Sequence, residues 1–276
     1  MSPPPKSPVS TTEIRETIAR LASQAASTPL SAVRRRRLEA EIRSLTEDLG
    51  RILRNLDPVS EPTTVFDPSN PKLVGRFVAL ALVAQARCSL ASVPKTYGSG
   101  IYAIYYNGPF KAYQPIARTE TPIYVGTASP AVPNARTPFE QGAKLSERIA
   151  YHAGNVGKAN STLDLADFEF RSLVVQSGWE KQAESYLIHF FGPVWNKETK
   201  IVSGFGKHGD SAEMRKHGRS PWDTLHPARA WAGDSQSDQK TAAQIENELS
   251  EHFKFHQPYA STEAILAEFF KELQQV

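Results

Sequence analysis

The chain has 276 residues, of which 40% are hydrophobic and 22% are charged, so it can bury a core and is not a wholly disordered protein. Its single cysteine, Cys88, excludes an intrachain disulfide framework and a cysteine-rich zinc module. The net charge of +3 hides an asymmetry, because residues 233–276 carry −5 and residues 1–232 carry +8. A basic body with an acidic tail favours a nucleic-acid or phosphate partner, although solvated surface charge explains it equally well.

The first 56 residues combine a low-complexity start with a helical pattern. Residues 1–30 begin with proline and serine, so we expect a disordered or weakly ordered lead-in. Apolar residues then recur at three- and four-residue steps across residues 31–56, which predicts a long amphipathic helix. These residues are Leu38, Ile42, Leu45, Leu49, Ile52 and Leu56. We expect this stripe to pack on the protein's own core, although it would also suit a dimer.

Four arginines, at positions 34–37, stand near the start of that helix. Cations are disfavoured at a helix N-terminus, so the run indicates either an arm that follows DNA phosphates or a solvated helix start. A linker at 57–70 leads into a second helix expected at 71–89, with Asn70 as its N-cap and Pro71 as its first residue. The longest apolar run, 77–84, is too short to cross a bilayer, and no secretory signal is visible. We therefore expect a cytoplasmic protein without a membrane partner.

Beyond residue 100 the pattern changes to short strands separated by helices. Strands are expected at 101–106, 122–126 and 168–175, and helices at 145–153, 179–191, 237–253 and 261–274. The stretch 201–227 is rich in glycine, histidine and arginine and is too long for an idle loop in a compact domain. This order of elements predicts an α+β fold.

The centre of the chain holds polar groups that a packed core would not require. Arg148 and His152 are four residues apart and so share one helix face. As a set, the polar groups supply one carboxylate for a metal ion, one guanidinium for phosphate charge and several groups able to transfer protons. Phosphodiester hydrolysis requires all three. The set is Tyr102, Tyr124, Arg148, His152, Glu184 and Asn196.

Two tripeptides in this region carry a family resemblance. Gly100-Ile101-Tyr102 followed by Tyr124-Val125-Gly126 resembles the signature of the GIY-YIG nuclease superfamily, with valine in place of the second isoleucine. Because the later polar residues follow in register, the chain is similar to the type II restriction endonucleases of this superfamily that cut CCGCGG. The similarity covers roughly residues 65–232 and includes the runs 75–83, 206–209 and 219–227.

The resemblance implies a small three-stranded antiparallel sheet flanked by helices, to which this chain adds N-terminal and C-terminal helical extensions. It divides the chain into a lead-in at 1–30, a GIY-YIG nuclease domain at 31–232 and an acidic helical extension at 233–276. It also implies hydrolysis of double-stranded DNA with one Mg²⁺ ion per active site, leaving a 5′-phosphate and a 3′-hydroxyl.

The resemblance also implies a role for each residue of the set. Tyr102 and Tyr124 match the tyrosines of the two tripeptides, Arg148 the catalytic arginine, His152 the histidine one turn later, Glu184 the metal ligand and Asn196 a downstream asparagine. The general base stays open. Tyrosine titrates near 10 and histidine near neutrality, so His152 rivals Tyr102, which the resemblance favours.

Recognition of a GC-rich site requires donors to guanine in the major groove. The segment 197–231 supplies candidates for DNA contact: Lys197, Lys200, Lys207, His208, Arg215, Lys216, His217 and Arg219. A palindromic site implies a homodimer, one active site for each strand. A companion DNA methyltransferase is expected in the same cell, although not as a bound partner.

Three other interpretations are weaker. Glu198-Thr199-Lys200 matches the E-x-K string of another nuclease class, but no Pro-Asp pair precedes it and it lies in an expected loop. A homing or repair nuclease of the GIY-YIG superfamily usually has a separate DNA-binding domain, for which this chain has no room. A non-catalytic DNA-binding protein would have no use for an isolated metal carboxylate.

Overall fold

A computed structural model describes residues 11–27, 31–56, 59, 62, 65, 67, 70–176, 178–206, 218–233, 235 and 237–273 of this chain. The chain divides into two units, Met1–Thr64 and Val65–Val276. The domain boundaries expected at 30/31 and 232/233 stay predictions. None of the described helices is long and apolar enough to cross a membrane.

The first unit contains two described helices, α1 (Thr11–Ser27) and α2 (Ala32–Leu56). Helix α2 confirms the helix expected at 31–56. Helix α1 was not expected, because its apolar repeat (Ile14, Ile18 and Leu21) is short. In the structure both isoleucines are exposed. No residue of this unit is among the buried apolar residues of the described chain.

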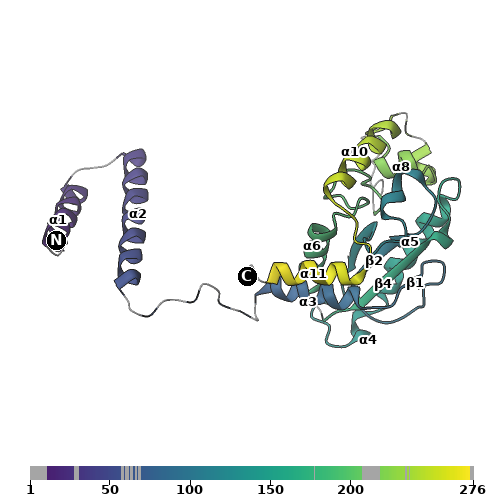
Figure 1. Ribbon diagram of the computed structural model, residues 1–276, viewed down its shortest axis with the longest axis horizontal. Helices are drawn as coiled ribbons and strands as arrows, with labels where there is room; N and C mark the ends of the chain where they lie inside the picture. The colour runs from purple at the N-terminus through teal and green to yellow at the C-terminus, as the bar shows by residue number, and fades with distance from the viewer. Residues whose placement is uncertain are drawn as a thin grey trace, which may run out of the picture. The chain divides into compact units, whose positions relative to one another are not determined.

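The second unit is built around an antiparallel sheet, shown with its helices in Figure 1. Its strands are β1 (Cys88–Ser89), β2 (Gly100–Tyr106), β3 (Tyr124–Ala128) and β4 (Phe168–Val174), in the order β1-β4-β2-β3. The α+β class and the three predicted strands are confirmed, but the expected strand count of three is corrected to four. The fourth strand arises because Cys88 and Ser89 pair with Phe170 and Glu169 of β4.

Helix α3 (Pro71–Val83) ends earlier than residue 89. Asn70 caps its start as predicted, with its side chain accepting from the Lys72 amide. Apolar periodicity stops at Val83, and Arg171 of β4 then donates from Nε to the Gln85 carbonyl at 2.7 Å. This contact holds the chain after the helix against the sheet, where it continues as β1.

The faces of β2 carry two separate apolar cores, because successive side chains of a strand point to opposite sides. Tyr102, Ile104 and Tyr106 enter the first core, together with residues of α5 (Lys144–Lys158), α8 (Pro221–Leu225) and α10 (Ala242–Phe255). Ile101, Ala103 and Tyr105 enter the second core, with α3, α6 (Glu180–Phe191) and α11 (Thr262–Leu273). Figure 1 shows α11 beside α3, and Arg76 pairs with Glu272 between them at 3.6 Å.

Shorter elements complete the unit. They are the 3-10 turns η1 (Lys111–Ile116) and η2 (Leu165–Asp167) and the short helices α4 (Pro138–Gln141) and α9 (Ala230–Gly233). Gly192 ends α6 in the left-handed conformation, with φ of 56°. Pro193 follows it and cannot continue the helix. The chain then turns back toward β3, where the Trp195 amide donates to the Ile123 carbonyl at 3.0 Å.

Candidate active site

The two signature tyrosines come together because a glycine lies between them. Tyr102 of β2 pairs in register with Gly126 of β3. A Cβ atom at Gly126 would lie 2.4 Å from Tyr102 Oη and 2.9 Å from Tyr124 Cε1, closer than real Cβ atoms come. The missing side chain thus leaves room for both rings, whose centroids are 6.1 Å apart.

Gly100, at the start of β2, meets a different requirement. Its φ is 153°, and a Cβ atom there would lie 2.1 Å from the Leu173 carbonyl oxygen of β4. Only glycine fits both the backbone angle and this close approach. Gly100 therefore allows β2 to pair closely with β4, whereas Gly126 leaves room for the two tyrosine rings of the site.

Helix α5 places His152 directly against Tyr102. The His152 Nε2 atom lies 2.7 Å from Tyr102 Oη, and both side chains are fully buried. The imidazole stacks on Phe205 at a centroid distance of 4.5 Å, while its Nδ1 atom has no hydrogen-bond partner in the described part of the chain. Burial, with the nearby Arg148 charge, lowers the pKa of His152 well below its ordinary value, so the imidazole is neutral at pH 7.

Both tyrosines are neutral for the same physical reason. Burial raises the pKa of Tyr102 well above its ordinary value and also raises that of Tyr124, while the Arg148 guanidinium opposes both shifts. Burial alone would lower the pKa of Arg148, but the two tyrosine oxygens raise it, so the guanidinium stays charged. The α5 side of the site thus consists of one fixed cation beside three neutral groups.

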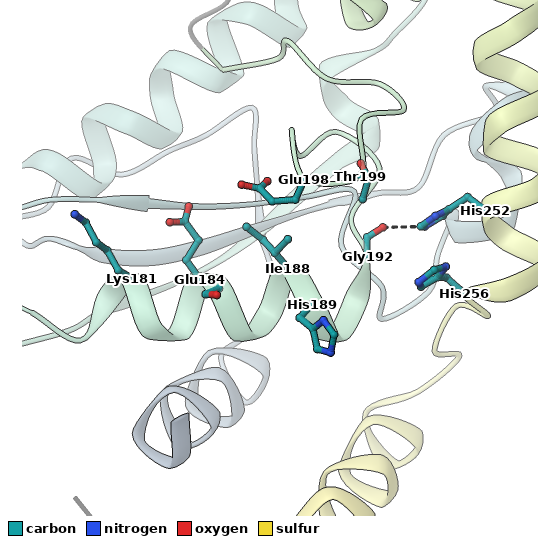
Figure 2. A pocket seen from close by; sticks show the side chains of 10 residues that line it. Lys181, Glu184, Ile188, His189, Gly192, Glu198, Thr199, His252 and His256 are labelled. Atoms are coloured by element: carbon teal, nitrogen blue, oxygen red, sulfur yellow. Dashed lines mark hydrogen bonds between the residues drawn. The ribbon is translucent and has the colours of Figure 1, made fainter. Parts of the chain in front are cut away.

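Glu184 reaches the site from the opposite face of the sheet. It lies on α6, and its Oε2 atom accepts from Thr127 Oγ1 of β3 at 3.1 Å. Burial raises the pKa of this carboxyl; Thr127 and the Lys197 charge oppose the shift, and the Glu198 carboxylate adds to it. Glu184 and Glu198 both line one pocket, and Figure 2 shows their carboxylates on the same side of α6.

A cleft of about 530 Å³ joins the two groups of residues at the outer edge of β3. Of the six predicted site residues, four line it, namely Tyr124, Arg148, Glu184 and Asn196. Tyr102 and His152 lie behind Tyr124, within the first core. All six residues therefore gather around one edge strand, although they come from β2, β3, α5, α6 and the segment after α6.

Asn196 is held entirely by the backbone of β3. Its Nδ2 atom donates to the Val125 carbonyl at 2.8 Å, and its Oδ1 atom accepts from the Val125 amide at 2.9 Å. The side chain thus takes the place that another strand would occupy beside Val125. It fixes the strand that carries Tyr124, and both of its hydrogen-bonding atoms are engaged there.

The loop at 201–206 contributes to the lining of the cleft and is held in place by a hydrogen bond from Arg229. Gly206 lies beside Arg148 and Tyr124, since a Cβ atom there would come within 3.8 Å of Arg148 Nη2. Arg229 donates to the Gly204 carbonyl at 2.8 Å and forms a buried bidentate pair with Asp223. This pair joins the loop to α8.

A second buried tyrosine–histidine pair lies nearby. Tyr113 Oη is 2.7 Å from His226 Nε2 and accepts from Trp195 Nε1 at 2.9 Å. His226 Nδ1 is 2.9 Å from Thr162 Oγ1, which donates to the Ala159 carbonyl. Every polar atom of the pair is thus bonded, and burial lowers the pKa of His226 to about 3.

The predicted DNA contacts fall into three groups. Lys197 lines the cleft, and Lys200 is exposed but is not among the residues that line it. Arg219 is already engaged, since it donates to both carboxylate oxygens of Asp238 at 2.6 and 3.0 Å. The others lie outside the described residues: Lys207, His208, Arg215, Lys216 and His217.

Sequence reasoning missed three contributors to the site: Thr127, Phe205 and Glu198. Thr127 directly follows the second signature tripeptide, and the alternation of a strand gives it the face opposite Gly126, toward α6. Phe205 carried no signal in the sequence. Glu198 was considered only as part of an E-x-K string and set aside, yet it lines the same cleft as Glu184.

A hard divalent cation fits the donor atoms of this cleft. The described residues contain no group of three histidine, cysteine, aspartate or glutamate side chains able to hold a metal. Thr127 is the only hydrogen-bond partner of Glu184 among them. One carboxylate facing an open cleft, with a second nearby, suits Mg²⁺, which keeps several of its waters and needs few protein ligands.

Comparison with known families places this geometry in context. The family model described as the Eco29kI GIY-YIG domain matches residues 94–253, which include strands β2 to β4, the residues that line the cleft and most of α10. No curated protein matches the chain.

Proposed function

Because the chain belongs to the family of the Eco29kI GIY-YIG domain, we propose that it is a type II restriction endonuclease that cuts double-stranded DNA at a short GC-rich palindrome, CCGCGG. As a member of this family, the chain contains a GIY-YIG nuclease domain, which makes it a DNA-cleaving hydrolase. One observation supports the cleavage of phosphodiester bonds most strongly. A fixed cation and a carboxylate, Arg148 and Glu184, meet in one cleft at an edge strand, with the Tyr102–His152 pair directly behind it.

Arg148 would bind the scissile phosphate. Its guanidinium is held charged by its surroundings and lines the cleft. Such a preorganised cation stabilises the extra negative charge of the transition state by more than it would in water. Tyr124, whose hydroxyl is neutral and lies beside Arg148, would orient the phosphate or the attacking water through a hydrogen bond.

The Tyr102–His152 pair would act together as the general base. Tyr102 alone cannot supply a phenolate at neutral pH, because burial raises its pKa. His152 is neutral, and its Nε2 atom is 2.7 Å from the Tyr102 oxygen. Because Tyr102 does not line the cleft, the attacking water would pass its proton to Tyr124 Oη, which would pass its own to Tyr102 Oη. Tyr102 would in turn pass its proton to His152 Nε2, so that no free phenolate is required.

Glu184 would hold one Mg²⁺ ion, with Thr127 fixing the orientation of the carboxylate. When bound, the ion would polarise the phosphate and neutralise charge on the leaving 3′-oxygen, so that a 5′-phosphate and a 3′-hydroxyl result. Asn196 would act as a positioning residue, because it holds β3 and thereby Tyr124.

The proposal extends to the partners of the protein. The double-stranded DNA substrate would contact Lys197 in the cleft and the exposed Lys200, and Arg219 only if its pair with Asp238 opens. A palindrome is cut on both strands most simply by a homodimer. A restriction enzyme also requires a companion DNA methyltransferase in the same cell and acts in the cytoplasm, where foreign DNA arrives.

The test is a plasmid digest with the full chain, with and without Mg²⁺, followed by sequencing of the ends. We expect discrete fragments cut at CCGCGG, only with the metal present. Glu184→Gln should reduce the rate at least about 100-fold, whereas Glu246→Gln on the exposed face of α10 should cut normally. A smear of fragments would point to a repair-type or nonspecific nuclease, and a mobility shift without cutting to a DNA-binding protein; either result rejects the proposal.

A further inference from the structure

Helix α2 carries a stricter repeat than a helix on a globular core requires. From Leu38 to Leu56, six of its apolar residues recur at alternating four- and three-residue steps, which makes a seven-residue repeat, and Leu53 lies beside this stripe. A stripe that faces a globular core is usually wider and follows a period of 3.6 residues. A period of 3.5 residues is the pattern of helices that wind around one another.

The unit that contains α2 leaves this stripe uncovered. Leu45 is 53% exposed and Ile52 is 55% exposed, and α1 buries neither of them. Ile42, Leu49 and Leu56 are also exposed, so within its own unit nearly the whole stripe has no covering element. An apolar face of this length on a charged helix is typical of an interaction surface.

We propose that α2 pairs with α2 of a second copy of this chain as an antiparallel two-stranded coiled coil. The stripe is self-complementary in this direction. Leu38 of one copy lies level with Leu56 of the other, Ile42 with Ile52, and Leu45 with Leu49, so all six residues of the stripe form layers. The twofold axis passes beside residue 47, at the middle of the repeat.

Charge selects the antiparallel direction over the parallel one. The four arginines at 34–37 precede the repeat, and only Arg37 has an ion-pair partner among the described side chains, Glu41. In a parallel pair the two arginine runs would lie side by side and repel one another. In an antiparallel pair each run lies beyond the C-terminal end of the other helix, where the helix dipole favours cations.

This pairing would use residues outside the range 94–253 that the family model matches, because α2 is formed by Ala32–Leu56. Its role in cutting a palindrome rests on the proposed function, but the pairing itself does not. It can therefore be tested without DNA, and a chain that pairs but does not cut would reject only the proposed function.

The first test measures the mass of the full chain by sedimentation at micromolar concentration. We expect twice the 30.5 kDa of one chain. Leu45→Glu, in the middle of the stripe, should give the single-chain mass, whereas Ala40→Glu, with the same change of charge on the opposite face, should remain a dimer. An unchanged thermal unfolding transition of Leu45→Glu would exclude misfolding. A wild-type monomer, or a dimer that survives Leu45→Glu, would overturn the proposal.

The second test measures direction with cysteines in a Cys88→Ser background, since Cys88 is the only native thiol. In an antiparallel pair, Leu38→Cys and Leu56→Cys should each fail to crosslink alone and should crosslink when the two variants are mixed and oxidised. A parallel pair would crosslink each variant with itself, and that result would contradict the proposed direction.

Discussion

Two tyrosine–histidine pairs lie buried on the same side of the sheet, and both have an oxygen–nitrogen distance of 2.7 Å. In the Tyr113–His226 pair, a tryptophan, a threonine and a backbone carbonyl satisfy every remaining polar atom. In the Tyr102–His152 pair, His152 Nδ1 has no partner among the described residues. A charged guanidinium also stands beside this pair.

This difference indicates that the Tyr113–His226 pair has a structural role and that the Tyr102–His152 pair has a catalytic one. Short distance, burial and a lowered histidine pKa are common to both pairs, so none of them identifies a catalytic group. A closed network stabilises the fold, because each buried polar atom has a partner. An open pair beside a fixed charge and a cleft can exchange protons with a substrate, and its incomplete bonding is tolerated at functional sites.

The strongest test of this distinction compares two removals of a single hydroxyl group. Tyr102→Phe should lower the rate of plasmid cleavage about 10²–10⁴-fold, the usual range for loss of a general base. Tyr113→Phe should leave the rate per folded molecule close to normal but should lower the free energy of unfolding by about 1–3 kcal/mol, because Trp195 Nε1 and His226 Nε2 lose their partner.

Cleavage assays and urea unfolding of both variants give the comparison. If Tyr102→Phe cuts at nearly the normal rate, Tyr102 is not part of the base. A pH–rate profile of His152→Ala would then show whether the histidine acts alone.

A smaller effect should come from filling the space beneath the tyrosines. Gly126→Ala would place a methyl group against Tyr102 Oη and so displace it from His152. We expect a loss of about 10²-fold in cleavage rate, as a displacement of 1 Å near the chemistry produces.

The matched control is Gly154→Ala in α5, where no atom lies within 4 Å of the new methyl group. That variant should cut normally and should gain about 0.5–1 kcal/mol in stability, because alanine favours a helix more than glycine does. Equal activity of the two alanine variants would show that the tyrosine rings tolerate displacement.

The smallest expected effect is the pH dependence of the free energy of unfolding that His226 of the Tyr113–His226 pair contributes. His226 is neutral in the folded chain, with its pKa lowered to about 3, whereas in the unfolded chain it protonates near pH 6.5. Its contribution to stability is therefore complete above about pH 6.5 and falls by about 1.4 kcal/mol per pH unit below it, because only the unfolded state takes up the proton.

Urea unfolding at a series of pH values would measure this dependence. His226→Asn should show a slope smaller by one proton than that of the unsubstituted chain. Identical slopes would mean that His226 is protonated in the folded state or exposed to solvent.

Much of the fold followed from local patterns in the sequence. The strands at 101–106 and 168–175 and the helices at 145–153 and 179–191 were found because their apolar periods and stop signals are local. Strand β1 was missed because it has two residues and exists only through its pairing with β4. Its position depends on Arg171, which is 86 residues from Gln85, its hydrogen-bond partner.

In the candidate site, too, contacts between segments that are far apart in the sequence could not be predicted. The six polar residues were selected from their resemblance to a family, and the spacing of Arg148 and His152 on one helix face agrees with their shared position. Sequence spacing could not reveal that Asn196 bonds to Val125, nor that Thr127 holds Glu184, because each contact joins segments at least 57 residues apart. The signature tripeptide singled out Tyr102 and not Tyr113, but it could not reveal that each of these buried tyrosines lies beside a histidine.

The hydrogen bonds between Asn196 and Val125 also protect the edge of the sheet against aggregation. Strand β3 is the edge of the sheet, and an edge strand with free amide and carbonyl groups can pair with any other extended chain. A single side-chain amide occupies both groups of Val125, at the middle of the strand. Asn196→Ala would therefore free a template for aggregation beside the cleft, so that loss of solubility could accompany loss of cleavage.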